Sequence, residues 1–171
     1  MKSSSLVNQI VWILAFVLAQ VFFFGKFHLW EYAYCFIFVT LLISLPASNG
    51  KITNLIICFL IGLFIDAFND TPGINAFCSI SIYFIRDSIY QAISGKNDEE
   101  IRSTSFSISG LGILNFGTLL IISVFLYSLL FTLINTPGWH KLGYNILQTL
   151  ASTIFTVGIT LSLNIIFFSK N

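Results

Sequence analysis

Charged residues are scarce in this chain: Asp, Glu, Lys and Arg make up only 9% of its 171 residues, against about 25% in a typical soluble domain. This scarcity excludes an ordinary soluble domain. The 8 Lys and Arg residues form no basic cluster that could neutralise phosphates, so we expect no nucleic acid partner. The 3 cysteines, Cys35, Cys58 and Cys78, all fall in apolar runs. They are expected to be small buried side chains and not a disulfide framework.

Hydrophobic residues, by contrast, make up 56% of the sequence, including 19 phenylalanines. Apolar runs long enough to cross about 30 Å of hydrocarbon occur six times. We therefore predict an all-α integral membrane protein, a single polytopic domain folded as a six-helix transmembrane bundle. The predicted spans are 6–24, 29–45, 52–67, 72–89, 106–134 and 144–168.

The distribution of basic residues predicts the orientation of this bundle. No site of small residues follows the first run, so we expect that run to stay as a membrane anchor and not to be cleaved as a signal peptide. With six spans both termini lie on one side, and cytoplasmic loops retain Lys and Arg. The termini and the loops on their side hold Lys2, Lys51, Arg86, Lys96, Arg102 and Lys170, whereas the opposite loops hold Lys26 and Lys141. Both termini are therefore predicted to be cytoplasmic.

Asp66 is the main candidate for a working residue, because a charge inside an apolar run is costly and normally faces a bundle interior or a partner. Gly62 lies one turn earlier on the same face, where a glycine lets another helix backbone come close. Pro72 is expected at the first helical position of the fourth run, which places unpaired N–H groups beside the carboxylate. Our hypothesis is that a groove edged by Gly62, Asp66 and the Pro72-Gly73 turn receives a partner helix.

Polar residues also follow one face of the fourth and of the sixth run. Asn75 and Arg86 share a face of the fourth run, which we expect to pack toward Gly62 and Asp66. The stripe on the sixth run has two interpretations, hydrogen bonding between helices and a ligand cavity or partner groove. Its members are Asn145, Gln148, Thr149, Ser152, Thr156, Thr160 and Asn164. Gln20 is a similar polar residue in the first run.

Residues for catalysis or metal binding are poorly placed in this sequence. His28 and His140 have no cysteine or carboxylate at metal-ligand spacing, and no nucleophile with a base is recognisable. We expect no enzyme, no metal and no cofactor. The Arg86-Asp87 pair and the acidic run 98–100 are interpreted as a solvated cytoplasmic rim.

The order of these features resembles the MreD family of rod-shape-determining membrane proteins. The similarity rests on Gln20 late in the first run, on Leu45-Pro46 ending the second, and on the set Gly62, Asp66, Pro72, Gly73 and Asn75. It is clearest from Gln20 to Arg86. The chain departs from the family in lacking a proline at the start of the second run, where Glu31-Tyr32 stands instead.

The resemblance implies a non-enzymatic scaffold in the bacterial cytoplasmic membrane that helps control side-wall peptidoglycan synthesis and cell shape. Its implied main partner is MreC, within a wider assembly that contains MreB and a wall polymerase and transpeptidase. The family is also similar in fold to the substrate-binding subunits of energy-coupling-factor transporters. The alternative function is therefore a membrane-embedded subunit of a transporter that binds a small molecule.

Overall fold

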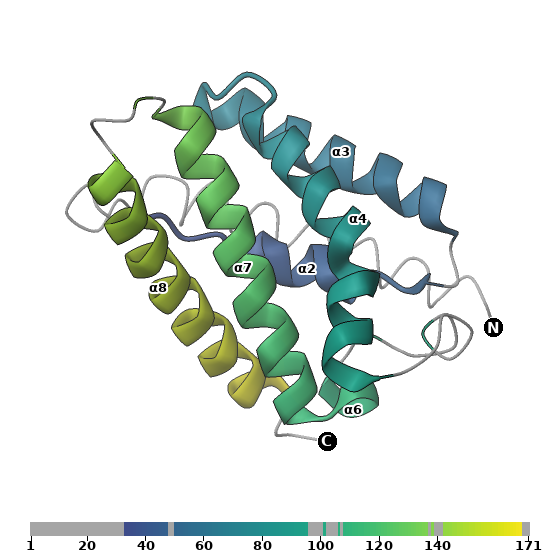
Figure 1. Cartoon of the computed structure of the whole chain (residues 1–171). Coiled ribbons are helices and arrows are strands. Elements are labelled where there is room, and N and C mark those ends of the chain that lie inside the picture. The colour runs from purple at the N-terminus through teal and green to yellow at the C-terminus, as the bar shows by residue number, and fades with distance from the viewer. Residues whose placement is uncertain are drawn as a thin grey trace.

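The computed structural model describes residues 33–47, 50–95, 101, 106, 108–136, 138 and 142–168. Its regular structure in these ranges is helical (Figure 1). The helices are α2 (Phe38–Ser44), α3 (Lys51–Asn69), α4 (Ile74–Ser94), α6 (Ile108–Leu111), α7 (Ile113–Asn135) and α8 (Leu142–Phe168). The predicted first span, 6–24, lies outside the described residues.

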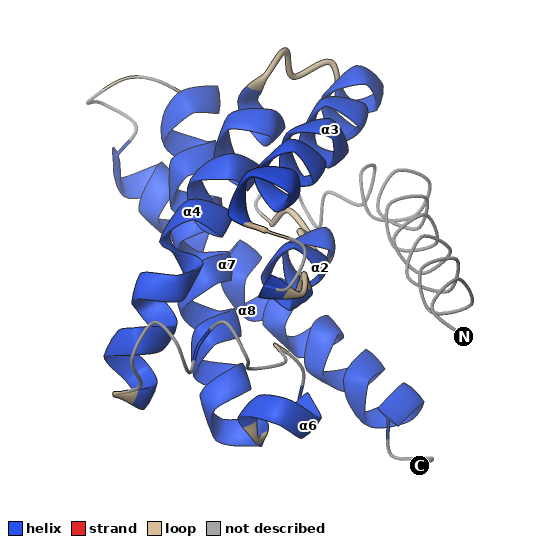
Figure 2. Cartoon of the chain, turned by 90° about the vertical axis from the view of Figure 1, so that its right-hand side faces the viewer, coloured by secondary structure: helices blue, strands red, loops and turns tan. Residues whose placement is uncertain are grey.

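The long helices pack side by side in chain order. α3 and α4 form a hairpin, α4 packs against α7, and α7 packs against α8. The short helix α2 lies inside this arrangement, in contact with α4 and α7 (Figures 1 and 2). Phe38, Val39, Leu42 and Ile43 of α2 are completely buried, so α2 forms the centre of the hydrophobic core.

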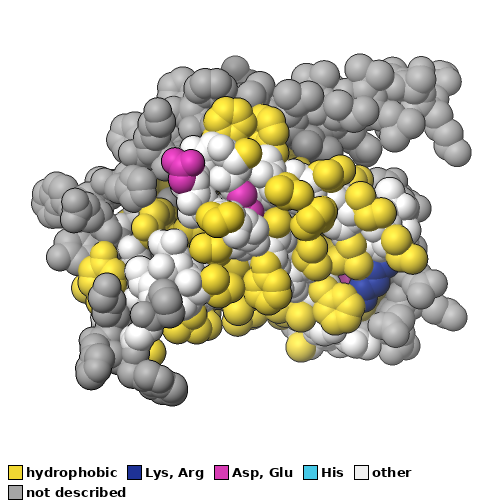
Figure 3. Space-filling model, turned by 90° about the horizontal axis from the view of Figure 1, so that it is seen from above, with side chains coloured by type: hydrophobic (Ala, Val, Ile, Leu, Met, Phe, Trp, Pro, Cys, Tyr) yellow, Lys and Arg dark blue, Asp and Glu magenta, His cyan; other side chains and the backbone are white. Residues whose placement is uncertain are grey.

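The outer surface has the composition expected of a membrane protein. Large apolar side chains are exposed along α3, α7 and α8, among them Phe64 (41%), Ile121 (47%) and Ile154 (74%). Apolar side chains also cover most of the described surface when the molecule is seen from above (Figure 3). Many polar side chains are instead buried, the reverse of the distribution in a soluble protein.

Three helices in the described ranges are long and apolar enough to cross a membrane: Lys51–Asn69, Ile113–Asn135 and the Leu142–Ser162 part of α8. This supports the coarser prediction, an all-helical membrane protein. It does not support the predicted count of six spans. Helix α4 has 21 residues, but its polar residues lower its hydropathy, and α2 has only 7 residues.

The helix boundaries differ from the predicted spans in several further places, and α4 ends at Ser94, not at residue 89. The predicted run 106–134 is divided at Gly112, whose φ of 78° separates α6 from α7. Helix α4 begins at Ile74, not at Pro72, because Pro72 and Gly73 form a turn. In this turn the Ile74 N–H donates to the Thr71 carbonyl (3.4 Å) and Gly73 has a φ of 79°. Proline followed by a glycine at positive φ is typical of a type II turn.

Of the predicted second span, 29–45, the structure describes residues 33–45, and these are helical only from Phe38 onward. Residues 33–37, here called the strap, have no helical structure. The strap N–H groups of Tyr34 and Phe36 donate to side chains of α8. A non-helical backbone at membrane depth is tolerated only where protein buries it, and Cys35, Phe36 and Ile37 are all at most 4% exposed. The apolar sequence thus specified burial but not a continuous helix.

Candidate functional site

The contact between α3 and α4 is closest at Gly62. A Cβ atom added there would lie 2.4 Å from the Ala76 Cα and 2.7 Å from the Asn75 carbonyl oxygen. Only glycine permits two backbones to approach so closely. The space beside Gly62 is therefore filled by α4 of the same chain, as expected from the polar face of the fourth run, and it is not open to the partner helix of our hypothesis.

The Asp66 carboxylate lies one turn further along α3, against the first turn of α4. Its Oδ1 accepts hydrogen bonds from the Thr71 hydroxyl (2.8 Å), the Asn75 N–H (2.9 Å) and the Asn75 side-chain amide (2.9 Å). Its Oδ2 accepts from the Ala76 N–H (2.9 Å). We call Asp66, Thr71, Asn75 and the Ala76 N–H the Asp66 cluster.

Asp66 of α3 acts as the N-terminal cap of the neighbouring helix, α4. A capping residue normally precedes its own helix and binds the N–H groups of the second and third helical residues. Here Gly73 precedes α4 and offers no side chain, and Asp66 of α3 accepts from those N–H groups instead. The negative charge also faces the positive end of the α4 dipole. The carboxylate is only 4% exposed, so these four donors stabilise its charge in place of water.

Tyr127 of α7 extends this network toward the centre of the molecule. Its hydroxyl donates to the Asn75 Oδ1 (2.7 Å) and its side chain is completely buried. Its ring packs against Phe36 of the strap and Phe38 of α2, with centroid distances of 4.9 and 5.4 Å. Tyr127 therefore contacts both the Asp66 cluster and the strap.

Arg86 lies in a second polar cluster, around the end of α2. Its side chain is completely buried, and its Nη1 donates to the carbonyls of Ile43 (3.2 Å) and Leu45 (2.7 Å). The guanidinium also lies over the rings of Tyr83 and Phe106, at 4.5 and 3.9 Å. A cation bound to the last carbonyls of a helix stabilises that helix, because it lies at the negative end of the helix dipole.

The interpretation of Arg86 as part of a solvated rim is wrong. Its Nε and Nη2 do pair with Asp87, at 3.0 and 2.9 Å, but only the Asp87 side chain reaches the surface, with 32% exposed. The burial of Arg86 is explained by acceptors that lie 41 and 43 residues earlier in the chain. The acidic run 98–100 lies outside the described residues.

Replacing Arg86 by lysine should destabilise the protein by about 2 kcal/mol, because a lysine lacks the planar fork that binds two carbonyls and stacks on rings. Thermal unfolding in detergent would measure the loss. The control is Asp70→Asn, a change at an exposed residue outside this cluster, which should stay within about 0.5 kcal/mol of the parent. If the lysine variant unfolded at the same temperature as the parent, the bonds from Arg86 to the two carbonyls would contribute nothing measurable to stability.

The stripe on α8 is buried where its side chains are described, and it makes two sets of contacts. Asn145 and Thr149 face the end of α7, where Thr136 donates to the Asn145 Oδ1 (2.7 Å) and the Thr132 and Thr149 hydroxyls are 3.0 Å apart. Further along, the stripe faces the strap and α2. Ser152 accepts from the Tyr34 N–H (2.9 Å), Thr156 from the Phe36 N–H (3.0 Å), and Thr160 from the Thr40 hydroxyl (3.4 Å). The stripe thus binds the chain's own non-helical backbone.

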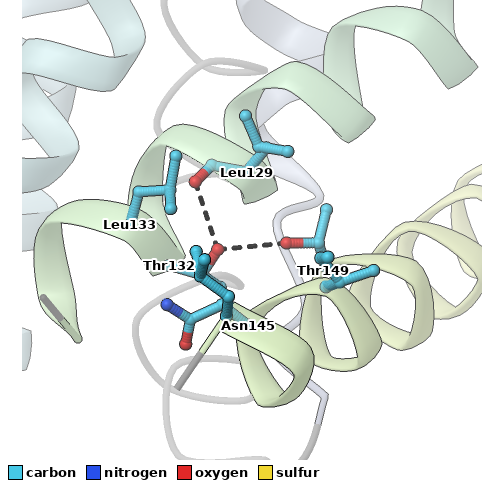
Figure 4. A pocket seen from close by; sticks show the side chains of 7 residues that line it. Leu129, Thr132, Leu133, Asn145 and Thr149 are labelled. Carbon is cyan, nitrogen blue, oxygen red and sulfur yellow. Dashed lines mark hydrogen bonds between the residues drawn. The ribbon is translucent and has the colours of Figure 1, made fainter. Parts of the chain in front are cut away.

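A small cavity lies between α7 and α8 beside the upper part of the stripe. Leu129, Thr132, Leu133, Asn145 and Thr149 line it (Figure 4), and its volume is about 20 Å³. A water molecule fits into such a space, whereas drug-sized ligands occupy roughly 300–1,000 Å³. This cavity gives no support to the alternative of a small-molecule-binding subunit.

The remaining candidates are placed as follows. Gln20, His28 and His140 lie outside the described residues, as does the side chain of Asn164 on α8. Gln148 of the stripe is 2% exposed. Within the described ranges, no group of three or more His, Cys, Asp or Glu side chains could hold a metal ion.

Three residues of these clusters were missed by the sequence analysis: Asn54, Tyr83 and Tyr127. Asn54 of α3 donates to the Pro46 carbonyl (2.8 Å) and to the Tyr83 hydroxyl (2.7 Å), so it also binds the chain as it leaves α2. A signal for Asn54 existed, since Asn54, Cys58, Gly62 and Asp66 recur every four residues along one face of α3. Tyr127 lies in α7, where apolar residues occur on every side of the helix, so the sequence gives no such signal.

Comparison with known proteins adds no relative to this description. No family model matches the chain, and neither a curated protein nor a solved structure matches it. The assignment of function therefore depends on the residues and contacts described above.

Proposed function

We propose that this chain is a non-enzymatic membrane scaffold of the bacterial cell-wall elongation machinery and that it binds MreC. The observation that carries this proposal is the Asp66 cluster. Five of the residues on which the resemblance to the MreD family rests, Gly62, Asp66, Pro72, Gly73 and Asn75, lie in one continuous unit at the α3–α4 turn. An ordered set of residues that forms one unit in space is better support for a family than the same residues scattered.

The scaffold role is supported by how the buried polar groups are used. Asp66 accepts from four donors, and Arg86 donates to the end of α2. Both charges hold helices of this chain in place. In this proposal Gly62 and Asp66 affect the partner indirectly, by fixing the shape of the α3–α4 hairpin, because α4 already covers them.

The wider proposal follows the same resemblance. The chain resides in the bacterial cytoplasmic membrane with both termini in the cytoplasm, and the complex with MreC joins MreB and the wall polymerase and transpeptidase. Its role is to help control side-wall peptidoglycan synthesis and so cell shape.

Co-purification tests the proposal. The tagged chain, expressed with MreC from its own genome in mild detergent, should give a defined complex on size exclusion. Asp66→Asn should lower the yield of complex about tenfold through the loosened hairpin, on the scale of one lost charged hydrogen bond. The matched control is Asp70→Asn, the same change at the residue that ends α3, which should leave the yield unchanged.

Two results would count against the scaffold. The first is a parent chain that runs without MreC. The second is a parent chain that retains a small molecule detectable by mass spectrometry, which would favour the transporter alternative.

A further inference from the structure

The hydrogen-bond network of the Asp66 cluster meets the aromatic packing around the strap at Tyr127. On one side its hydroxyl donates to Asn75, which donates in turn to Asp66 (2.7 and 2.9 Å). On the other side its ring is tilted by 56° against Phe36 and by 89° against Phe38. The bond to Asn75 fixes the position of the phenol oxygen and so holds the ring in place against the strap.

Part of the backbone of the strap is bound to side chains of α8. The N–H groups of Tyr34 and Phe36 bind the hydroxyls of Ser152 and Thr156, where a helix would have its own internal bonds. Because these bonds are not part of a continuous helix, the strap can open as a local unit separate from the helices around it. The packing of Phe36 and Phe38 on Tyr127 is then an important part of what keeps the strap closed.

We propose that Tyr127 couples the α3–α4 turn to the strap, so that loosening the Asp66 cluster raises the population of molecules in which the strap is open. The coupling is reciprocal: whatever closes the strap also tightens the turn. This inference goes beyond the proposed function, because it concerns the chain alone and holds with any partner or none.

The chain contains its own reporters for a test. Cys35 lies in the strap and is 2% exposed, and Cys58 lies in α3 and is completely buried. Alkylation of the purified protein by N-ethylmaleimide, followed by mass spectrometry of each cysteine, measures local opening at both. Thr71→Val removes a hydroxyl that donates to Asp66 and accepts from Asn75, and Tyr127→Phe removes only the phenol oxygen.

Each variant should raise the alkylation rate of Cys35 about tenfold, the effect of about one lost buried hydrogen bond, and that of Cys58 less than about twofold. In the double variant Thr71→Val should add nothing, because the connection is already broken. The control is Thr118→Val, whose hydroxyl donates only to the Leu114 carbonyl within α7 (2.9 Å).

Two results would overturn the coupling. One is an equal effect of Thr71→Val with and without the Tyr127 hydroxyl, which would mean that the turn and the strap act independently. The other is a parallel rise at Cys35 and Cys58, which would mean that the Asp66 cluster stabilises the whole fold and not the strap in particular.

Discussion

Replacing Gly62 by alanine is expected to destabilise the folded chain by about 3 kcal/mol, the upper part of the range for overpacked cores. The added methyl group would lie 2.4 Å from the Ala76 Cα and 2.7 Å from the Ala76 nitrogen. Both atoms belong to a helix backbone, which cannot move aside as a side chain can. The hairpin must therefore open, and the bonds from Asn75 and Ala76 to Asp66 weaken with it.

Thermal unfolding in detergent, followed by circular dichroism, measures this effect. The matched controls are Gly117→Ala in α7 and Gly158→Ala in α8, where an added Cβ meets nothing within 4 Å. Each control should be neutral or stabilise the protein by up to about 1 kcal/mol, because alanine favours a helix more than glycine does. A Gly62 variant with the midpoint of these controls would contradict the close contact.

Asp66→Asn is expected to cost about 3 kcal/mol, because an amide cannot reproduce a carboxylate that accepts on both oxygens. If the amide oxygen replaces Oδ1, the amide nitrogen faces the N–H of Ala76, and two donors then oppose each other. If the amide is flipped, its nitrogen faces the three donors that now bind Oδ1. The loss of negative charge also removes the favourable interaction with the α4 dipole.

The same unfolding measurement applies, with Asp70→Asn as the control. Asp70 has a φ of 52°, a conformation that asparagine adopts readily, and its side chain is exposed. That change should stay within about 0.5 kcal/mol of the parent. Equal stability of the Asp66 and Asp70 variants would show that the carboxylate is not the cap of α4.

The arrangement around Asp66 could be anticipated from sequence because its signals are local. A carboxylate in an apolar run needs donors, and the nearest are the N–H groups of the helix after the turn. The structure places Asn75 and Ala76 there, 9 and 10 residues from Asp66. Gly62 indicated the close contact correctly, but a sequence does not show whether the neighbouring helix belongs to the same chain or to a partner.

The strap could not be anticipated, because the hydropathy of a segment does not depend on the conformation of its backbone. Residues 33–37 are as apolar in a strap as in a helix, and their partners on α8 are 118 and 120 residues away. The stripe on α8 was recognised, but its use required knowledge of which segment lacks helical hydrogen bonds.

Arg86 was misplaced for a related reason. Its neighbour Asp87 suggests a surface ion pair, and the acceptors that bury Arg86 exist only because α2 ends at Leu45. The boundaries of a short interior helix cannot be recognised within a long apolar run. The sequence therefore does not predict that free carbonyls at the end of α2 would bind a cation.

The strap and α2 together also cover a given distance with fewer residues than a continuous helix would need. Tyr34 and Phe36 bind hydroxyls one helical turn apart on α8, so two residues of the strap advance about as far as four residues of helix. The chain from Tyr34 to Thr40, six residues on, therefore follows α8 from Ser152 to Thr160, a distance of about 12 Å. A continuous helix would need about eight residues to follow α8 over the same distance.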